Sequence, residues 1–522
     1  MPVSAQDRRW KVLAVLCVAV FLVVVDNTVV NVALPTLARD LHASNSALQW
    51  IVDGYSLPFA GLLLAGGGMS DRLGRKRVMT GALVAFGVFS LFAAYSQTVS
   101  TLLSARALMG AAAAFIFPAT LSLLTVSFKD PSERATAFGI WGAVAGAAIA
   151  VGPIVGGALI THFWFGSIFL INIPIVLLAV VATTIVVPES RSALRRRLDV
   201  GGLVFGTSGV TTLVLAIIEG PSWGWRAATT LTLFGASLVL LVAFATYELR
   251  RSGPLLDVRV FRNGAFSAGS GAIATSYFCL FGFIFLITQY FQMVRGYSAL
   301  SAGVHTLPFA IVTAIMTPLG ALVAQRVGVR YVVSAGLAIM AFALGWAATI
   351  SATATFFGPI IGSMTVMALG FSLISAPATT TIMGTLTPEQ VGAGAASNET
   401  TRELGGTMGV AIIGSVFSSI FGPQVRAAFG HLGLTSSQLN EAQRSMAAAQ
   451  ATVARLPRSL ANVPRTEVTQ AFMTGLLRGC VVGALIAAAV AVVIFRFLPK
   501  RVNRAQVSVE EAELLTLTVG GV

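Results

Sequence analysis

The sequence contains little charge for its length. Of its 522 residues only 10% are Asp, Glu, Lys or Arg, whereas 56% are hydrophobic. A soluble protein carries about a quarter charged residues and could not keep this much apolar surface away from water. The mean hydropathy of +0.84 agrees. The composition therefore excludes a soluble globular protein and predicts an all-α polytopic membrane protein.

Cysteine and histidine are scarce as well. The three cysteines (Cys17, Cys279 and Cys480) lie far apart in separate apolar runs, and the four histidines are scattered. Such spacing provides neither a disulfide framework nor a set of metal ligands. No loop carries a nucleophile beside a base or a phosphate-binding glycine motif. We therefore expect no enzyme activity, no cofactor, no metal site and no ATP-driven pump.

Fourteen transmembrane helices are predicted, because apolar windows of membrane length recur with short breaks between them. The first window is longer than the apolar part of a removable signal peptide, so we expect it to be retained. The windows lie at roughly 12–34, 48–69, 78–96, 101–126, 134–160, 166–187, 200–219, 227–247, 264–293, 299–324, 329–350, 354–384, 390–421 and 471–498.

The basic residues predict which way the spans face. When the N-terminus is placed in the cytoplasm, most Arg and Lys residues fall in inner segments, and the short outer segments hold Arg39, Arg226 and Arg295. The positive-inside rule favours this orientation, with both termini cytoplasmic. The net charge of +14 then indicates contact with membrane lipids, not with nucleic acid. The bias toward Arg and Ala points to a bacterium, and hence to its cytoplasmic (inner) membrane.

Asp26 is the most informative single residue, because it stands in the middle of the first apolar run. A carboxylate at the centre of a transmembrane helix costs ~2.5–3.5 kcal/mol on insertion scales, so its presence indicates a function. We expect this group to exchange a proton and so to couple transport to proton movement. Arg106 in the fourth span is its expected partner, unless the guanidinium reaches the membrane interface instead.

The inner loop between the second and third spans predicts a gating element. It contains Asp71, Arg72, Gly74 and Arg75 in the order G-x-x-x-D-R-x-G-R-K. Glycine allows a tight turn, and Asp71 can form ion pairs with neighbouring helix ends that hold an inner gate closed. The alternative is an ordinary cationic inner loop. A weaker echo at residues 325–330, between spans ten and eleven, suggests two repeated halves.

The fifth span predicts a second gating element at Gly152 and Pro153, within the pattern G-x-x-x-G followed by G-P-x-x-G-G. Small residues four apart let helices approach closely, and the proline bends the axis. The alternative is ordinary packing of small residues.

These motifs together resemble the major facilitator superfamily, and within it the fourteen-helix drug:proton antiporter family of the EmrB/QacA type. The stretch from Asp26 to Pro35 matches the family's first-span signature D-x-T-[IV]-V-N-V-A-L-P, and the loop at Asp71, Arg106 and Gly152-Pro153 match further motifs. The resemblance runs from about residue 10 to 498. One departure is the segment 163–167, where many relatives carry Trp-Arg-Trp and this chain has no arginine.

The resemblance implies the major facilitator fold, with two six-helix bundles around a central cavity and two extra helices inserted between them. The expected units are 1–190, the inserted helices with linkers at 191–262, and 263–498, which includes a long outer loop at 422–470 containing a helix near 436–454. Residues 499–522 are expected to form a cytoplasmic tail. We expect a monomer.

Three further acids are the candidates for substrate binding. Asp53 lies in the outer part of the second span, where family members that export lipophilic cations tend to have Asp. Glu399 and Glu403 lie near mid-membrane in the thirteenth span. Arg402 could neutralise one of them, perhaps Glu399 three residues earlier, and a purely structural ion pair is the alternative. Aromatic residues of the ninth span, such as Phe281, could stack on planar cations; core packing is the alternative.

The expected function is proton-coupled antiport that exports lipophilic cationic drugs or dyes. A protonated carboxyl group offers no charge, whereas the deprotonated group attracts a cation in a low-dielectric cleft, so proton and substrate compete. The alternative is a proton-coupled exporter of a neutral or anionic secondary metabolite or lipid, in which the acids serve only protons. A receptor or scaffold would not explain the buried acids together with the Asp71 loop.

Overall fold

The computed structural model describes residues 5–128, 130–191, 199–251, 258–385 and 391–498, and every regular element in these ranges is a helix. Thirteen of the helices there are long and apolar enough to cross a membrane, and the bent helix α2 (Asn45–Leu73) raises the number to fourteen. The prediction of an all-α protein with fourteen spans is therefore confirmed. The predicted tail at 499–522 lies outside the described residues.

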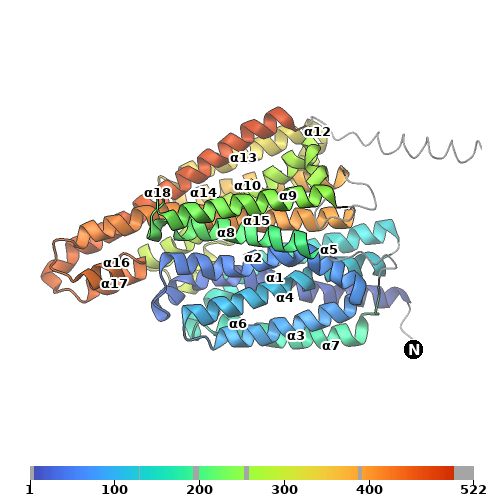
Figure 1. The fold of residues 1–522 in the computed structure, drawn as a ribbon, viewed down its shortest axis with the longest axis horizontal. Coiled ribbons are helices and arrows are strands. Elements are labelled where there is room, and N and C mark those ends of the chain that lie inside the picture. Colours follow the sequence, from blue (N-terminus) through green and yellow to red (C-terminus); the bar gives the residue numbers. More distant parts are fainter. Residues whose placement is uncertain (1–4, 129, 192–198, 252–257, 386–390, 499–522) are drawn as a thin grey trace, which may run out of the picture.

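The first seven helices pack together as one unit, here called the N-terminal half (Figure 1). In it α4 contacts α2 and α3, while α1 contacts α5 and α7. Besides α2, these helices are α1 (Ala5–Asp40), α3 (Arg75–Ala94), α4 (Val99–Ser127), α5 (Pro131–His162), the short α6 (Ser167–Leu170) and α7 (Asn172–Val186).

The last part of the chain forms the C-terminal half, in which α10 contacts α14, α15 and α18, and α13 contacts α14 and α18. Short 3-10 and π segments adjoin its spans: η1 (Val258–Arg262) precedes α10, η2 (Tyr290–Val294) follows it, and η3 (Phe356–Ile360) precedes α14. Its α-helices are α10 (Gly264–Gln289), α11 (Ala299–Val304), α12 (Leu307–Val327), α13 (Val329–Ala347), α14 (Ile361–Gly384), α15 (Val391–Phe429), α16 (Ser436–Ala442), α17 (Met446–Ala454) and α18 (Arg458–Phe497).

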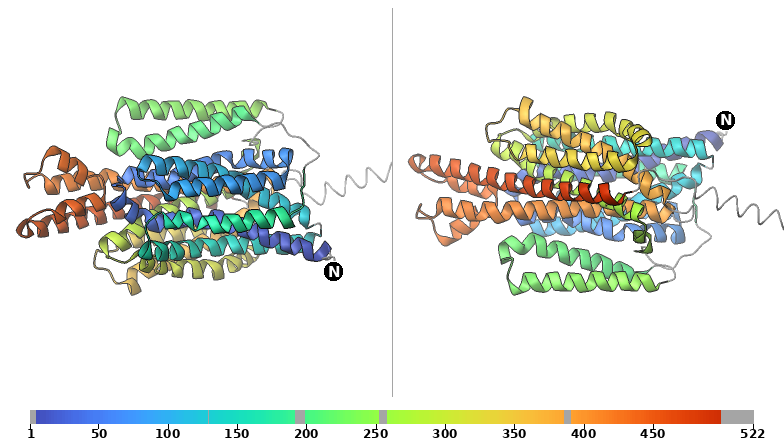
Figure 2. Two further views of the ribbon diagram at one scale, coloured as in Figure 1. Left: turned by 90° about the horizontal axis from the view of Figure 1, so that it is seen from below. Right: turned by 90° about the horizontal axis from the view of Figure 1, so that it is seen from above.

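The two inserted helices, α8 (Val200–Trp223) and α9 (Ala228–Arg250), pair with each other at the edge of the molecule (Figure 2). α8 also packs against α2 of the N-terminal half and α15 of the C-terminal half. The pair is central in the sequence but peripheral in space. The exact unit boundaries expected at residues 190, 262 and 498 stay predictions.

Several of the spans have a side-chain cap at their N-terminal end. Ser44 accepts a hydrogen bond from the backbone N–H of Ala47 at 3.1 Å, and Asp130 accepts one from Glu133 at 2.9 Å. The first turn of a helix leaves its N–H groups without backbone partners, and such groups are costly near a membrane. Capping therefore fixes where these spans start.

The two halves repeat one local turn. Gly74, between α2 and α3, has φ 111°, and Gly328, between α12 and α13, has φ 108°. Residues other than glycine are strained at such angles. The echo of the Asp71 loop at residues 325–330 is thus present in the backbone as well as in the sequence.

The halves meet along two helix pairs, α2 with α15 and α5 with α11, and we call this contact the seam. Across it, Gln49 Nε2 donates to the carbonyl of Val410 at 3.3 Å, and the backbone N–H of Leu300 donates to Thr161 Oγ1 at 3.2 Å. Gln49 lies in the first turns of α2, which follow the end of α1 farthest from the N-terminus, so this contact lies at the end of the bundle opposite the N-terminus. The halves are therefore held together at that end.

The same end carries a helical extension formed by α16 and α17 with the ends of α15 and α18 (Figure 1). The helix expected near 436–454 is present as two short helices. The expected outer loop at 422–470 is helical at both ends, because α15 continues to Phe429 and α18 begins at Arg458; its bounds stay a prediction. The backbone N–H of Asn45 donates to the Arg444 carbonyl at 2.7 Å, so the extension rests on the N-terminal half as well.

Candidate functional site

Asp26 of α1 is fully buried and pairs with Arg106 of α4, as the sequence predicts. Arg106 Nη1 lies 2.7 Å from Asp26 Oδ2, and both side chains are 0% exposed. The guanidinium also donates through Nε to the Ile51 carbonyl at 3.2 Å, and its Cζ lies 4.3 Å from the ring centroid of Tyr55. The buried pair is therefore electrically neutral and ties α1, α2 and α4 together.

Asn172 completes this cluster, and the sequence analysis did not assign it a role. Its Nδ2 donates to Asp26 Oδ1 at 2.7 Å and to Ser90 Oγ at 3.0 Å. Ser90 in turn donates to the Phe169 carbonyl at 2.8 Å. The sequence feature that could have indicated a role for Asn172 is its position as a lone Asn in the apolar run from Phe169 to Pro174. It could not be matched to Asp26, because the two lie 146 residues apart.

Asp53 of α2 differs from Asp26 because its charge has no partner. The residue is 0% exposed, and neither carboxylate oxygen has a hydrogen-bond partner among the described residues. An ionised carboxylate without donors is costly to bury. In this arrangement Asp53 therefore requires either a proton or a bound cation.

Asp53 belongs to the face of α2 that meets the seam. Gln49, which contacts α15, lies one turn before it, and Leu57, which packs with Ala411 of α15 and Val214 of α8, lies one turn after it. Trp50 on the same side donates to Glu219 of α8 at 3.0 Å. The seam and α8 therefore cover Asp53, and separating the halves would uncover it.

Glu399 and Arg402 of α15 form the ion pair expected from their spacing. Arg402 Nη1 lies 3.3 Å from Glu399 Oε2, and the two side chains are 23% and 16% exposed. Arg402 Nη2 also donates to Thr379 Oγ1 of α14 at 3.1 Å, and its Cζ lies 5.6 Å from the ring centroid of Tyr277 of α10. Three helices thus hold this arginine in place.

Glu403 has no ion-pair partner in the described part of the chain, although it follows Arg402 directly. Together, Glu399, Arg402 and Glu403 carry one net negative charge when both acids are ionised. Within this group of three side chains one carboxylate is therefore uncompensated, as is that of Asp53 in the N-terminal half.

Aromatic rings surround the Arg402 cluster. Tyr277 stacks on Phe281 with ring centroids 6.1 Å apart and meets Phe371 edge-on at 5.3 Å. Phe281 of the ninth span is thus linked to Arg402 through Tyr277. Tyr290 and Phe291 are 0% exposed and belong to the apolar core, so the core interpretation holds for them.

The Asp71 loop is built within the N-terminal half. Arg75 Nη2 lies 2.7 Å from Asp71 Oδ1, and the backbone N–H of Arg75 donates to the Ser190 carbonyl at 3.0 Å. Gly74 forms the turn, and a Cβ there would lie 2.8 Å from the Glu189 carboxylate. Arg72 is exposed. The ion pair of Asp71 therefore joins the end of α2 to the start of α3 and does not reach the C-terminal half in this arrangement.

Gly152 and Pro153 lie where α5 touches two other helices. A Cβ at Gly152 would come within 2.0 Å of Thr28 Oγ1 of α1. A Cβ at Gly303 of α11 would lie 2.2 Å from the Pro153 carbonyl oxygen. Only residues without side chains permit this approach. The segment therefore forms part of the seam, while its gating role stays a prediction.

The protein consists of two helical halves, and ionisable groups are buried inside the halves and between them. This arrangement is typical of a secondary transporter that crosses the membrane many times. The sequence matches the Major Facilitator Superfamily over residues 16–410. It is 35% identical over 487 residues to the multidrug efflux pump LfrA of Mycolicibacterium smegmatis, covering 93% of this chain and 96% of that protein. The chain therefore belongs to the Major Facilitator Superfamily.

Other relatives are also resistance or export proteins. The methyl viologen resistance protein SmvA of Salmonella typhimurium is 35% identical, with 86% of this chain and 90% of that protein covered. The tetracenomycin C resistance and export protein of Streptomyces glaucescens is 32% identical, with 80% and 77% covered. A bacterial homologue of the lysosomal transporter Spinster, solved inward-facing and unoccupied, matches the fold with a TM-score of 0.64 at 17% identity, covering 96% of this chain and all of that one.

Proposed function

We propose that the protein is a proton-coupled antiporter that exports lipophilic cationic drugs or dyes. Relatives named as a multidrug efflux pump and as a methyl viologen resistance protein support this substrate class, since methyl viologen is a dication. The cargo would meet two uncompensated carboxylates, Asp53 and Glu403, and an aromatic wall at Tyr277 and Phe281. Rings of this kind attract cations when water is excluded.

The observation that carries the proposal is the buried and unpartnered carboxyl group of Asp53. A single negative charge cannot hold a proton and a cationic drug at once. Binding of one therefore releases the other, and this competition is the chemical basis of exchange. Because the seam covers Asp53, the exchange would be linked to separation of the halves.

Asp26 and Arg106 would serve proton coupling indirectly, by holding α1, α2 and α4 in register. A proton that reached Asp26 would leave Arg106 without its counter-ion, which is strongly unfavourable for a buried charge. Release of this arginine would loosen the contact between these helices. The pair would thus convert protonation into helix movement without contacting the cargo.

We further propose that the protein lies in a bacterial cytoplasmic membrane as a monomer, with both termini cytoplasmic. The excess of basic residues in segments such as Arg72 to Arg77 supports this orientation. The seam would then close the outer side, and the cavity would open toward the cytoplasm. The Asp71 loop would join the C-terminal half only after the protein turns outward, as a gate that alternates with the seam.

The test is drug efflux from proteoliposomes under an imposed pH gradient, with Asp53→Asn compared with the wild type. The variant keeps the shape of the side chain but cannot carry its charge. We expect transport of a monovalent dye such as ethidium to fall at least about tenfold, the ratio given by ~1.4 kcal/mol. The exposed Asp40→Asn variant is the matched control. Two results would contradict the proposal: dye transport by the wild type that does not depend on the pH gradient, or dye transport by Asp53→Asn at the wild-type rate.

A second candidate is a proton-coupled exporter of a neutral or anionic secondary metabolite or lipid. The relative named as an export protein for tetracenomycin C favours it. In that case the acids would serve only protons. Parallel assays with ethidium and an uncharged amphiphile separate the two, because only the first proposal predicts transport confined to cations.

A further inference from the structure

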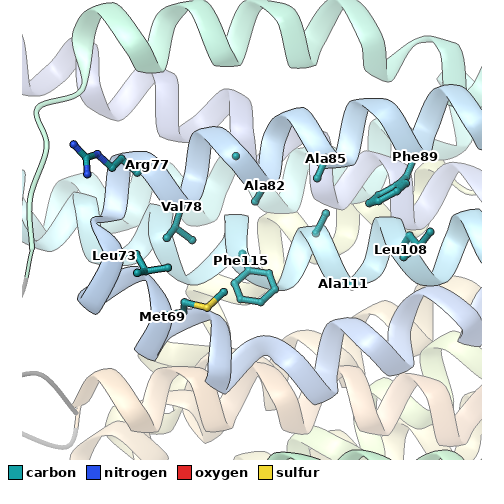
Figure 3. Close-up of a pocket in the computed structure, with 12 residues that line it drawn as sticks. Met69, Leu73, Arg77, Val78, Ala82, Ala85, Phe89, Leu108, Ala111 and Phe115 are labelled. Carbon is teal, nitrogen blue, oxygen red and sulfur yellow. The ribbon is translucent and has the colours of Figure 1, made fainter. Parts of the chain in front are cut away.

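A groove runs along the outer face of the N-terminal half, away from the seam, between α3, α4 and the end of α2 (Figure 3). Its cavity volume is about 580 Å³. Small residues, among them Gly81, Ala82 and Ala111, line its floor, and Phe89 and Phe115 flank it. A Cβ at Gly81 would meet no atom within 4 Å. The groove is therefore open space that the protein leaves unfilled.

Cationic side chains stand at one end of the groove. Arg77 lines it and is 71% exposed, with Glu189 Oε2 as a distant partner at 3.6 Å. Lys76 donates through Nζ to the Thr184 carbonyl at 2.7 Å, and it shares a polar hollow with Arg77 and Glu189. Arg75, by contrast, is only 14% exposed and is held by Asp71. Arg77 is thus an accessible arginine that lines the groove itself.

The dimensions fit one lipid chain. Arg77 and Phe89 are twelve positions apart on α3, which corresponds to ~18 Å at the rise of an α-helix. Half the hydrocarbon thickness of a bilayer is ~15 Å. The groove therefore extends from the headgroup level to about the middle of the membrane, with positive charge at the headgroup end.

We propose that this groove binds one anionic phospholipid of the cytoplasmic leaflet, with its phosphate at Arg77 and Lys76 and an acyl chain over Gly81. Basic pockets between transmembrane helices on the cytoplasmic side suit anionic headgroups. A cationic drug is disfavoured, because Arg77 and Lys76 would repel it at the entrance. The site is separate from Asp53 and Glu403, so lipid binding does not depend on the proposed cargo, whereas the choice of the cytoplasmic leaflet rests on the proposed orientation.

Native mass spectrometry of the full-length protein in detergent tests the proposal. Phosphatidylglycerol and phosphatidylcholine with identical acyl chains are added, and retained lipid is counted. We expect one phosphatidylglycerol to bind in preference to phosphatidylcholine. Gly81→Leu fills the groove and should abolish this retention. Arg77→Gln should weaken it roughly fivefold, as expected for the loss of one basic residue near a headgroup.

Gly235→Leu is the matched control. It lies on the exposed face of α9, and a Cβ there also meets nothing within 4 Å, so lipid retention should be unchanged. Retention of phosphatidylglycerol that is the same in wild type, Gly81→Leu and Arg77→Gln would overturn the proposal. So would a groove that binds ethidium, revealed by ethidium binding that Gly81→Leu removes while leaving phosphatidylglycerol retention intact.

Discussion

At the scale of single residues, the four candidate acids, Asp26, Asp53, Glu399 and Glu403, fall into two kinds. Asp26 and Glu399 each have an arginine within 3.3 Å, whereas Asp53 and Glu403 have no ion-pair partner among the described residues. A paired acid is held by its partner and shapes the protein. An unpaired acid in an apolar setting is available to a proton or a cation, which is the property that antiport requires.

Because Asp26 pairs with Arg106, we expect the losses of stability caused by replacing each residue to be non-additive. Asp26→Asn and Arg106→Gln should each lower the stability of the N-terminal half by about 3–5 kcal/mol, because each leaves one buried charge alone. The double variant should be more stable than either single variant. Thermal unfolding in detergent measures this. Strictly additive losses would mean that the two charges do not depend on each other.

Replacing Arg402 should change the preference of the transporter between monovalent and divalent cations. It acts as a resident cation beside Glu399, so Arg402→Gln should leave two uncompensated acids on α15. At ~10 Å and an effective dielectric constant of ~20, an extra charge contributes roughly 1.7 kcal/mol, or more than tenfold in affinity. Efflux of a dication such as methyl viologen should therefore improve relative to ethidium. The exposed Arg426→Gln on the same helix should leave the ratio unchanged, and an unchanged ratio in Arg402→Gln would refute the idea.

At the scale of helices, glycine decides how closely α5 approaches its neighbours. A Cβ at Gly157 would lie 2.4 Å from the backbone carbonyl oxygen of Ala299, whereas a Cβ at Gly146 on the same helix would meet nothing within 4 Å. A backbone atom cannot move aside as a side-chain end can. The contact between α5 and α11 is therefore sensitive to one methyl group.

Gly157→Ala should consequently push the seam apart and slow transport several-fold, since overpacking costs about 1–3 kcal/mol. Gly146→Ala should transport normally. The initial rate of dye efflux compares the two proteins at equal amounts in the membrane. Equal rates would show that the seam tolerates the added methyl group, and α5 would then have no special part in the cycle.

At the scale of the whole molecule, the halves touch where Thr161 and Leu300 meet, and alternating access requires this contact to open. Cysteines at both positions, joined by a short thiol cross-linker, should stop efflux, and a reductant-cleavable linker should restore it. The natural cysteines Cys17, Cys279 and Cys480 are buried, so they should not react. Full transport in the cross-linked protein, verified by mass, would exclude opening of the seam.

Much of this protein could be predicted from local sequence. The fourteen spans follow from apolar runs, because a membrane admits helices with few charges and little else. The pairing of Arg106 with Asp26, and of Arg402 with Glu399, follows from the cost of a lone buried charge. Asn172 could not be predicted, because its partner is remote in the sequence. The full lengths of α15 and α18 could not be predicted either, because both helices continue past their most apolar stretches.

The amino-acid sequence by itself determined the number of helices, the rarity and position of the buried acids, and the turn at Gly74, because each depends on local composition or on one backbone angle. Only the tertiary structure decided that Asp53 is buried without a partner on the face of α2 that meets the seam, and that a groove opens beside Arg77. These properties depend on contacts between helices that are distant in the chain, and no local pattern specifies such contacts.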